Sequence, residues 1–130
     1  MDEKKAILMV DDDESIVFLL QITLSEHYKE KYAYETALNA NEAMDIIDEL
    51  AQSGVEVILI LSDWLMPGIK GDEFLIKVHE KYPGIKAIMI SGYADSESVI
   101  KMREKIKLSA FINKPWNVDD LISEVDKCLG

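Results

Sequence analysis

Short apolar runs and longer amphipathic stretches alternate along the chain, with turn residues between them. Five apolar runs, at residues 6–10, 32–36, 55–61, 87–90 and 110–112, have the composition and length of β-strands. The run at 55–61 reads VEVILIL, which is typical of a strand buried on both faces. The run at 32–36 alternates only weakly, which indicates an edge strand. The pattern therefore predicts five strands.

The stretches between and after these runs carry apolar residues at the spacing of one helix face. The predicted stripes consist of Ile16, Leu20 and Leu24; of Ala43, Ile46, Ile47 and Leu50; of Phe74, Leu75 and Val78; of Val99, Met102 and Ile106; and of Val118, Leu121, Ile122 and Val125. Strands that alternate with helices favour a parallel sheet with helices on both faces. We therefore expect a three-layer, doubly wound α/β fold with five parallel strands and five helices, in one domain over residues 1–130.

Charge and cysteine content narrow the classes of partner and the compartment. The chain has 14 Lys and Arg against 25 Asp and Glu, for a net charge of −11. This balance argues against direct binding to nucleic acid, which needs basic groups to displace counterions, and against binding to anionic membrane surfaces. Cys128 is the only cysteine, and the N-terminal residues lack the pattern of a signal peptide. We expect a cytoplasmic protein.

Reactive side chains gather where four of the five predicted strands end. They are Asp11, Asp12 and Asp13 after the first run, Ser62 and Asp63 after the third, Ser91 after the fourth, and Lys114 after the fifth. Each residue alone has an ordinary structural explanation, such as a helix cap, a turn or a solvated lysine. In open parallel sheets, however, ligands bind outside the carboxyl ends of the strands, so these groups are predicted to share one pocket.

These residue types together favour phosphoryl transfer to an aspartate. Carboxylates such as Asp11, Asp12 and Asp63 are the ligands that Mg²⁺ (or Mn²⁺) prefers, together with a phosphate. Phosphoryl transfer mainly requires positioning and charge neutralisation. We predict that Asp63 attacks the phosphorus, while Lys114 and the Ser91 hydroxyl contact the phosphoryl oxygens.

Four segments resemble the receiver domain of bacterial two-component response regulators. They are ILMVDDD at 7–13, LSDWLMPGIKG at 61–71, IMISGYAD at 88–95 and FINKPW at 111–116, and the resemblance covers essentially the whole chain. It implies a flavodoxin-like sheet of order 2-1-3-4-5. It also implies phosphorelay signalling rather than a turnover enzyme, although the domain catalyses its own phosphorylation and dephosphorylation. The implied donor is a phosphohistidine on a sensor histidine kinase or a histidine phosphotransfer protein.

The resemblance also assigns roles residue by residue. Asp11, Asp12, Asp63 and the backbone carbonyl of Leu65 would hold the metal, with Asp63 as the phosphoacceptor, whereas Asp13 is an extra acid that we expect to cap a helix. Lys114 would contact the phosphoryl group, and Ser91 with Phe111 would form the switch. Phe111 stands where the family often has Tyr.

The implied switch acts at a distance from the phosphoryl group. Phosphorylation would draw in Ser91 and turn Phe111 inward, which changes a surface between about residues 96 and 129. That surface would contact a downstream protein or effector domain, and Val99, Met102 and Trp116 are candidates for part of it or for core packing. We further predict a cis peptide between Lys114 and Pro115. Leu65 and Tyr93 are predicted to flank the phosphoryl group and to slow its hydrolysis.

Two other functions remain open on the sequence alone. Asp11, Asp13 and Ser15 also resemble the DxDx[ST] motif of haloacid-dehalogenase-type phosphatases, in which Asp11 would be the nucleophile. That reading leaves Asp63 unexplained. A degenerate receiver that serves only as an interaction module is the second alternative, and the filled site positions argue against it.

Overall fold

The computed structural model describes residues 4–63, 71–92 and 108–129. Within these ranges the chain forms one five-stranded parallel sheet of order β2-β1-β3-β4-β5, which confirms the predicted fold and strand order. The strands are β1 (Lys4–Val10), β2 (Ala33–Ala37), β3 (Val55–Asp63), β4 (Lys86–Ser91) and β5 (Leu108–Asn113). The run predicted as an edge strand is β2, and it lies at the edge of the sheet.

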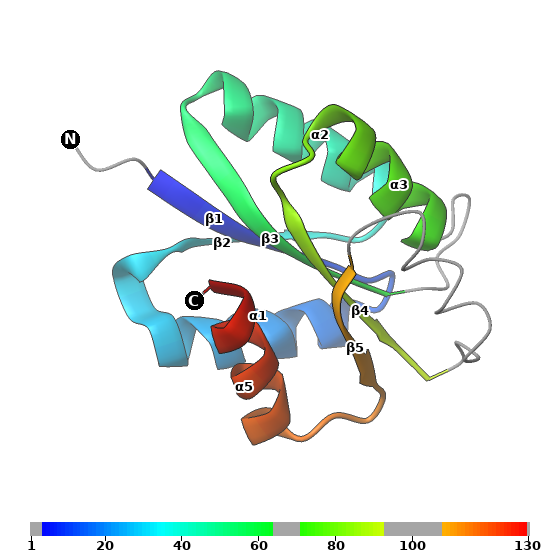
Figure 1. The fold of residues 1–130 in the computed structure, drawn as a ribbon. Helices are drawn as coiled ribbons and strands as arrows, with labels where there is room; N and C mark the ends of the chain where they lie inside the picture. Colours follow the sequence, from blue (N-terminus) through cyan, green and yellow to red (C-terminus); the bar gives the residue numbers. More distant parts are fainter. Residues whose placement is uncertain (1–3, 64–70, 93–107, 130) are drawn as a thin grey trace.

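Helices cover both faces of this sheet. They are α1 (Glu14–Tyr28), the short 3-10 helix η1 (Lys29–Lys31), α2 (Ala40–Gln52), α3 (Gly71–Lys81) and α5 (Val118–Leu129). Figure 1 shows α1 and α5 below the sheet and α2 and α3 above it. The predicted helix with Val99, Met102 and Ile106 falls outside the described residues. None of the helices in the described ranges is long and apolar enough to span a membrane.

The sheet separates two apolar cores because successive strand residues point to opposite faces. In β1, Leu8 and Val10 join the core under α2 and α3, whereas Ile7 and Met9 join the core under α1 and α5. The stripe of Phe74, Leu75 and Val78 is buried, as predicted. The sheet is thus fixed from both sides, which holds the ends of its central strands in place.

One predicted helix stripe needs correction. In α1, Leu20 and Leu24 are buried as predicted, and Ile16 is half-buried and packs against the same core. In α5, Leu121 and Val125 are buried as predicted, but Val118 is 53% exposed. Val118 is the first residue of α5 and stands outside the core that Leu121 and Val125 join.

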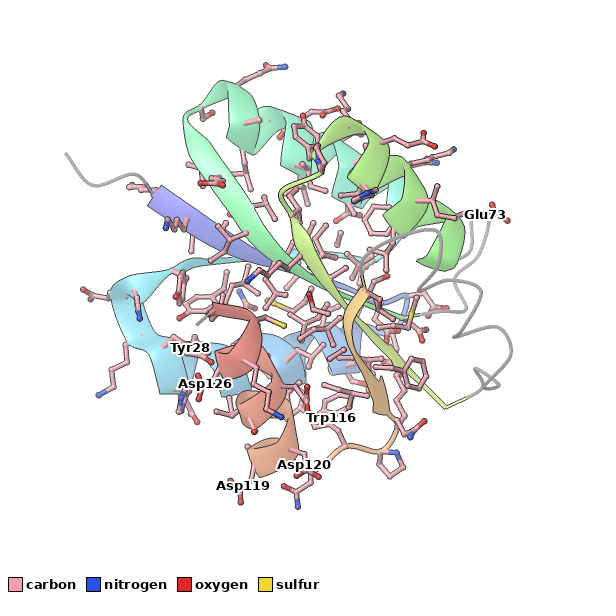
Figure 2. The ribbon with its side chains drawn as sticks, in the orientation of Figure 1. Tyr28, Glu73, Trp116, Asp119, Asp120 and Asp126 are labelled. Atoms are coloured by element: carbon pink, nitrogen blue, oxygen red, sulfur yellow. The ribbon has the colours of Figure 1, made fainter. Side chains whose placement is uncertain are left out.

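Polar contacts fix the ends of α1 and α5. Asp13 caps α1, because its carboxylate accepts hydrogen bonds from the Ser15 amide at 2.9 Å and the Ser15 hydroxyl at 2.6 Å. Asn117 caps α5 through the Asp119 amide at 2.8 Å. At the other end of α1 the Tyr28 hydroxyl donates to the Asp126 carboxylate of α5, and Figure 2 shows these two side chains together. The caps leave both helices starting directly beside the ends of β1 and β5.

Candidate functional site

Three strand ends bring the candidate residues together. Asp11 directly follows β1, Asp63 is the last residue of β3, and Lys114 directly follows β5. Val10 pairs with Ser62 across β1 and β3, and Asp63 pairs with Ile90 across β3 and β4. Because all strands are parallel, these pairings place the three side chains at one edge of the sheet.

Three carboxylates converge at this edge. One oxygen from each of Asp11, Asp12 and Asp63 can be chosen so that all three lie within 4.8 Å of one another. Asp11 is 2% exposed and Asp63 8% exposed, whereas Asp12 is exposed. Like charges at such distances repel, and burial disfavours ionised carboxylates, so the cluster favours a bound cation.

Lys114 supplies positive charge to the two buried members of the cluster. Its Nζ lies 2.8 Å from Asp11 Oδ2 and 3.3 Å from Asp63 Oδ1. Partial burial by itself lowers the pKa of Lys114, but the hydrogen bond and charge of Asp11 and the charge of Asp63 outweigh it and raise the pKa. The ammonium therefore stays charged at neutral pH and neutralises part of the cluster.

The three acidic residues after β1 differ in their hydrogen bonds and in the direction of their pKa shifts. The amide of Asp13 donates to Asp11 Oδ1 at 2.9 Å, which leaves Asp11 Oδ2 directed to Lys114. Partial burial, together with a hydrogen bond to Asp11 and the charge of Asp11, raises the pKa of Asp12. The hydrogen bonds from Ser15 lower the pKa of Asp13. Asp13 is thus a helix cap, as predicted, and its carboxylate is already engaged outside the cluster.

Phe111 and Pro115 occupy the strand and turn that lead to and from Lys114. Phe111 is half-buried in β5, is in register with Met89 of β4, and packs against the core under α2 and α3. The peptide between Lys114 and Pro115 is cis, as predicted. Trp116, two residues before α5 (Figure 2), packs against the core under α1 and α5.

Some predicted residues fall outside what the structure describes. Ser91 ends β4, where its backbone is in register with Asn113 of β5, but its side chain is not among the described ones. Leu65, Tyr93, Val99 and Met102 also fall outside the described residues. Their predicted roles remain predictions.

The sequence placed Ser62 at the strand end without assigning it a specific role, and the structure shows it to be buried. This side chain is 0% exposed, and its hydroxyl donates to the Asp63 carbonyl at 3.0 Å. A buried hydroxyl needs a partner, so this contact helps to fix the peptide that follows Asp63. The only available signal was the polar residue inside an apolar strand sequence.

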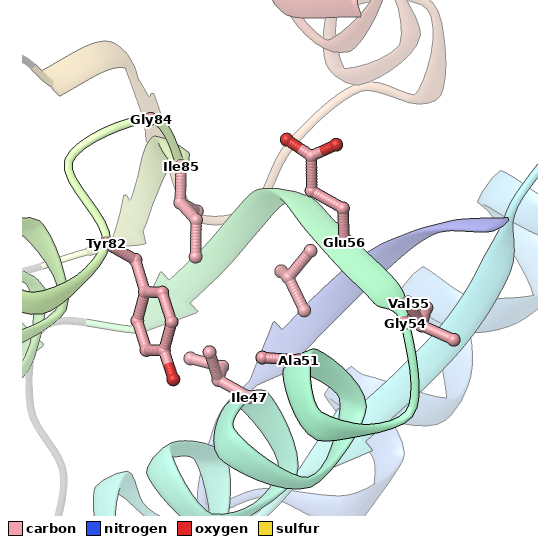
Figure 3. A pocket seen from close by; sticks show the side chains of 9 residues that line it. Ile47, Ala51, Gly54, Val55, Glu56, Tyr82, Gly84 and Ile85 are labelled. Atoms are coloured by element: carbon pink, nitrogen blue, oxygen red, sulfur yellow. The ribbon is translucent and has the colours of Figure 1, made fainter. Parts of the chain in front are cut away.

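A cavity lies at the opposite, amino end of β3. It has a volume of about 360 Å³ and is lined mainly by apolar side chains of α2 and β3, together with Tyr82. Figure 3 shows the Tyr82 ring beside Ile47 at this cavity. No residue of the carboxylate cluster lines this cavity.

The fold and the cluster agree with a family comparison. A family model for the response regulator receiver domain matches residues 7–126. The chain therefore belongs to the response regulator receiver family, whose domains act in phosphorelay signal transduction.

Individual relatives are similar over nearly the whole chain. The hydrogenase transcriptional regulatory protein HoxA of Cupriavidus necator is 38% identical over 124 residues, which cover 95% of this chain but 24% of HoxA. The chain thus spans about a quarter of the length of that relative. Sporulation initiation phosphotransferase F of Bacillus subtilis is 30% identical over 129 residues, covering 99% of this chain and 95% of that protein. A CheY-like receiver domain protein from Methanospirillum hungatei has a TM-score of 0.83 at 33% identity, covering 97% and 94% of the two chains.

Proposed function

We propose that the chain is a phosphoacceptor in which Asp63 receives a phosphoryl group. The observation that carries this proposal is the meeting of the Asp11, Asp12 and Asp63 carboxylates with the Lys114 ammonium at one edge of the sheet. A nucleophilic carboxylate, a cation and spare oxygen ligands are what phosphoryl transfer to aspartate requires. Membership of the receiver family supports the same chemistry.

The donor set fits Mg²⁺ or Mn²⁺. Mg²⁺ is bound through one or two carboxylates with water and phosphate oxygens, and the three clustered carboxylates offer such ligands. Asp11, Asp12 and Asp63 would hold the ion, with the Leu65 backbone carbonyl as a neutral ligand. The chemistry that the ion supplies when bound is neutralisation of charge on the phosphoryl oxygens.

The side chains of the site have separate roles in phosphoryl transfer. An oxygen of Asp63 forms a bond to phosphorus while the bond between phosphorus and the donor breaks, and the donor leaves with that electron pair. Lys114, which stays charged, neutralises an oxygen of the transferred group. The backbone at Asp13 and the hydroxyl of Ser62 hold Asp11 and the Asp63 peptide in place.

Donor and output follow from the family and belong to the proposal. The donor is a phosphohistidine on a sensor histidine kinase or a histidine phosphotransfer protein. Ser91 and Phe111 carry the switch to the surface between about residues 96 and 129, which contacts a downstream protein or an effector domain rather than nucleic acid. The domain has no multiple-turnover substrate, because the phosphoryl group stays on Asp63 until water removes it.

The proposal also covers the residue range of the domain and its compartment in the cell. We place one receiver domain over residues 1–130, since the family match at 7–126 and the sheet leave no second core in the described ranges. We place it in the cytoplasm, which agrees with the single cysteine, Cys128, being free and buried. The phosphatase alternative would need Asp13 as an acid, yet its carboxylate caps α1. We therefore favour no second function.

The test is labelling by a small phosphodonor. Intact-mass measurement after incubation with acetyl phosphate and Mg²⁺ should show one added phosphoryl group. Asp63→Asn should remove the label, whereas Asp13→Asn, which can still cap a helix, should retain it. Full labelling of Asp63→Asn, or full labelling in excess chelator, would refute the proposal.

A further inference from the structure

A cleft lies between the outer edge of β5 and the helix α5. Among the described strands, β5 pairs with β4 alone, so its other edge has no strand beside it. Residues 111–113 of β5 all line the cleft, and since successive side chains point to opposite faces, the cleft follows the edge of the strand. Its volume is about 530 Å³, and no residue of the carboxylate cluster lines it.

The lining side chains of this cleft are of the kinds that recognise a guanidinium group. Asp120 and Glu124 contribute carboxylates, and Trp116 contributes an indole ring. Figure 2 shows Trp116 and Asp120 where β5 leads into α5. Arginine pairs with carboxylates through its planar fork of donors, and it stacks on aromatic rings, on Trp best of all. The cleft is therefore suited to arginine and not to an anionic group.

The two carboxylates are spaced for two arginines on one extended segment. Asp120 and Glu124 stand four residues apart on α5, so they share a helix face and are separated by about 6 Å along the helix axis. An extended chain advances about 3.3 Å per residue, which places every second side chain on the same side at intervals of about 6.6 Å. An extended Arg-x-Arg segment beside β5 therefore presents its guanidinium groups at a matching interval.

The charges around the cleft permit this binding and also provide a control. Lys127 Nζ lies 3.5 Å from Glu124 Oε1, but the Lys127 side chain is 71% exposed, so the pair contributes little and an arginine can replace it. Asp119 does not line the cleft, although it stands next to Asp120. The amides of Asp119 and Asp120 both donate to Asn117 Oδ1, at 2.8 and 3.4 Å. The two acids thus have similar backbone roles and differ in their access to the cleft.

We propose that the cleft between β5 and α5 binds an extended Arg-x-Arg segment of a partner protein, whose backbone pairs with the outer edge of β5. Asp120 and Glu124 accept hydrogen bonds from the two guanidinium groups, and Trp116 stacks on one of them. The proposal specifies the chemistry of the downstream partner and rests on the proposed function for that partner's role. Phe111, the proposed switch residue, lines the same cleft, so the bound segment contacts the residue that responds to phosphorylation.

The test is an NMR titration of the protein with the peptide acetyl-Ala-Arg-Val-Arg-Ala-amide. We expect saturable shifts of the β5 and α5 amides, and Asp120→Asn and Glu124→Gln should each raise Kd about fivefold, because each removes a charged partner. Asp119→Asn removes the same charge one residue away and should change Kd by less than about twofold. Lys127→Gln, which releases Glu124, should lower Kd by about twofold. A peptide with the spacing Arg-x-x-Arg should bind about fivefold more weakly, because its arginines point to opposite sides.

The outcomes separate this inference from the phosphoacceptor function. Labelling of Asp63 by acetyl phosphate should be unchanged in Asp120→Asn and Glu124→Gln, which also shows that both variants fold. Labelled protein that does not bind the peptide would overturn the cleft proposal alone, whereas binding without labelling would support the cleft and overturn the phosphoacceptor function. Equal weakening by Asp119→Asn and Asp120→Asn would overturn the cleft proposal, because it would show general attraction to an acidic protein. Equal binding of the two arginine spacings would overturn the extended geometry and with it the proposal.

Discussion

Each end of the sheet has a lysine in contact with aspartate, but the two contacts differ in how far water reaches them. At the carboxyl end, Lys114 contacts Asp11 and Asp63, which are almost fully buried. At the amino end, Lys81 Nζ lies 2.9 Å from Asp48 Oδ1, and the Tyr82 hydroxyl donates to the same carboxylate at 2.5 Å. The side chains of Lys81 and Asp48 are 55% and 31% exposed, so water reaches both.

Burial and charge imbalance explain why only one end is a candidate for chemistry. Asp48 is one carboxylate with a lysine and a hydroxyl, so its charge is satisfied in place. At the carboxyl end, three carboxylates lie close together, two of them almost fully buried, and among the described residues Lys114 is the lysine that pairs with those two. Repulsion among these carboxylates raises the free energy of the folded state, so the cluster favours binding of a cation and a phosphoryl group. The exposed ion pair at the amino end only connects α2 to α3.

The largest expected difference between the two ends concerns their lysines. Lys114→Met should lower the free energy of unfolding by about 1–3 kcal/mol in metal-free buffer, because it removes the ammonium that contacts the two buried carboxylates of Asp11 and Asp63. It should also slow phosphoryl transfer about 100-fold. Lys81→Met, the matched control, should change neither quantity measurably, because exposed ion pairs contribute little. Urea denaturation and labelling kinetics measure both, and equal destabilisation by the two substitutions would remove the distinction between the ends.

A smaller effect is expected from relieving the repulsion at the carboxyl end. Asp12→Asn removes one of three clustered charges, so the variant should melt at a higher temperature than the native protein in chelator. Mg²⁺ should raise the melting temperature of the native protein more than that of the variant. Asp13→Asn is the control, since Asp13 lies next in the chain but caps α1. If Asp13→Asn loses the Mg²⁺ effect and Asp12→Asn keeps it, the assignment of the metal ligands is wrong.

The smallest effect concerns pH dependence at the amino end. The hydrogen bond from Tyr82, and after it the one from Lys81, lowers the pKa of Asp48. A carboxylate whose pKa is lower in the folded state stabilises the fold above its unfolded pKa of about 3.9, and the contribution is lost as pH falls through the folded value. The native protein should therefore lose its small stability advantage over Asp48→Asn below about pH 4. Urea denaturation from pH 2.5 to 6 should show the two stability curves converging, and parallel curves would contradict the role of this contact.

The sequence predicted the fold well because its signals are local. Strand runs and helix stripes identified every described strand and the helices α1, α2, α3 and α5. Strand ends were less predictable, since Lys4 and Lys5 belong to β1 by pairing with Val55 and Glu56 rather than by hydrophobicity. Val118 was placed in the core because its spacing matches Leu121 and Val125, but spacing does not show how far the sheet extends beneath a helix.

The residues that form the candidate site could be predicted from the sequence, but the contacts between them could not. Asp11, Asp12, Asp63 and Lys114 were identified because parallel strands end at one edge. The contact of Lys114 with Asp11 depends on packing between segments far apart in sequence. Such contacts have no periodic signature, so only the folded arrangement reveals them.

The most direct measurement is the location of the phosphoryl group after reaction with acetyl phosphate and Mg²⁺. Fragmentation mass spectrometry of a rapid digest should find the added phosphoryl group on Asp63 in the native protein, with none on Asp48 and none anywhere in Asp63→Asn. A phosphoryl group on Asp11 or Asp48, or on Asp63 in the presence of excess chelator, would contradict the assignment of the carboxyl end as a metal-dependent phosphoacceptor site.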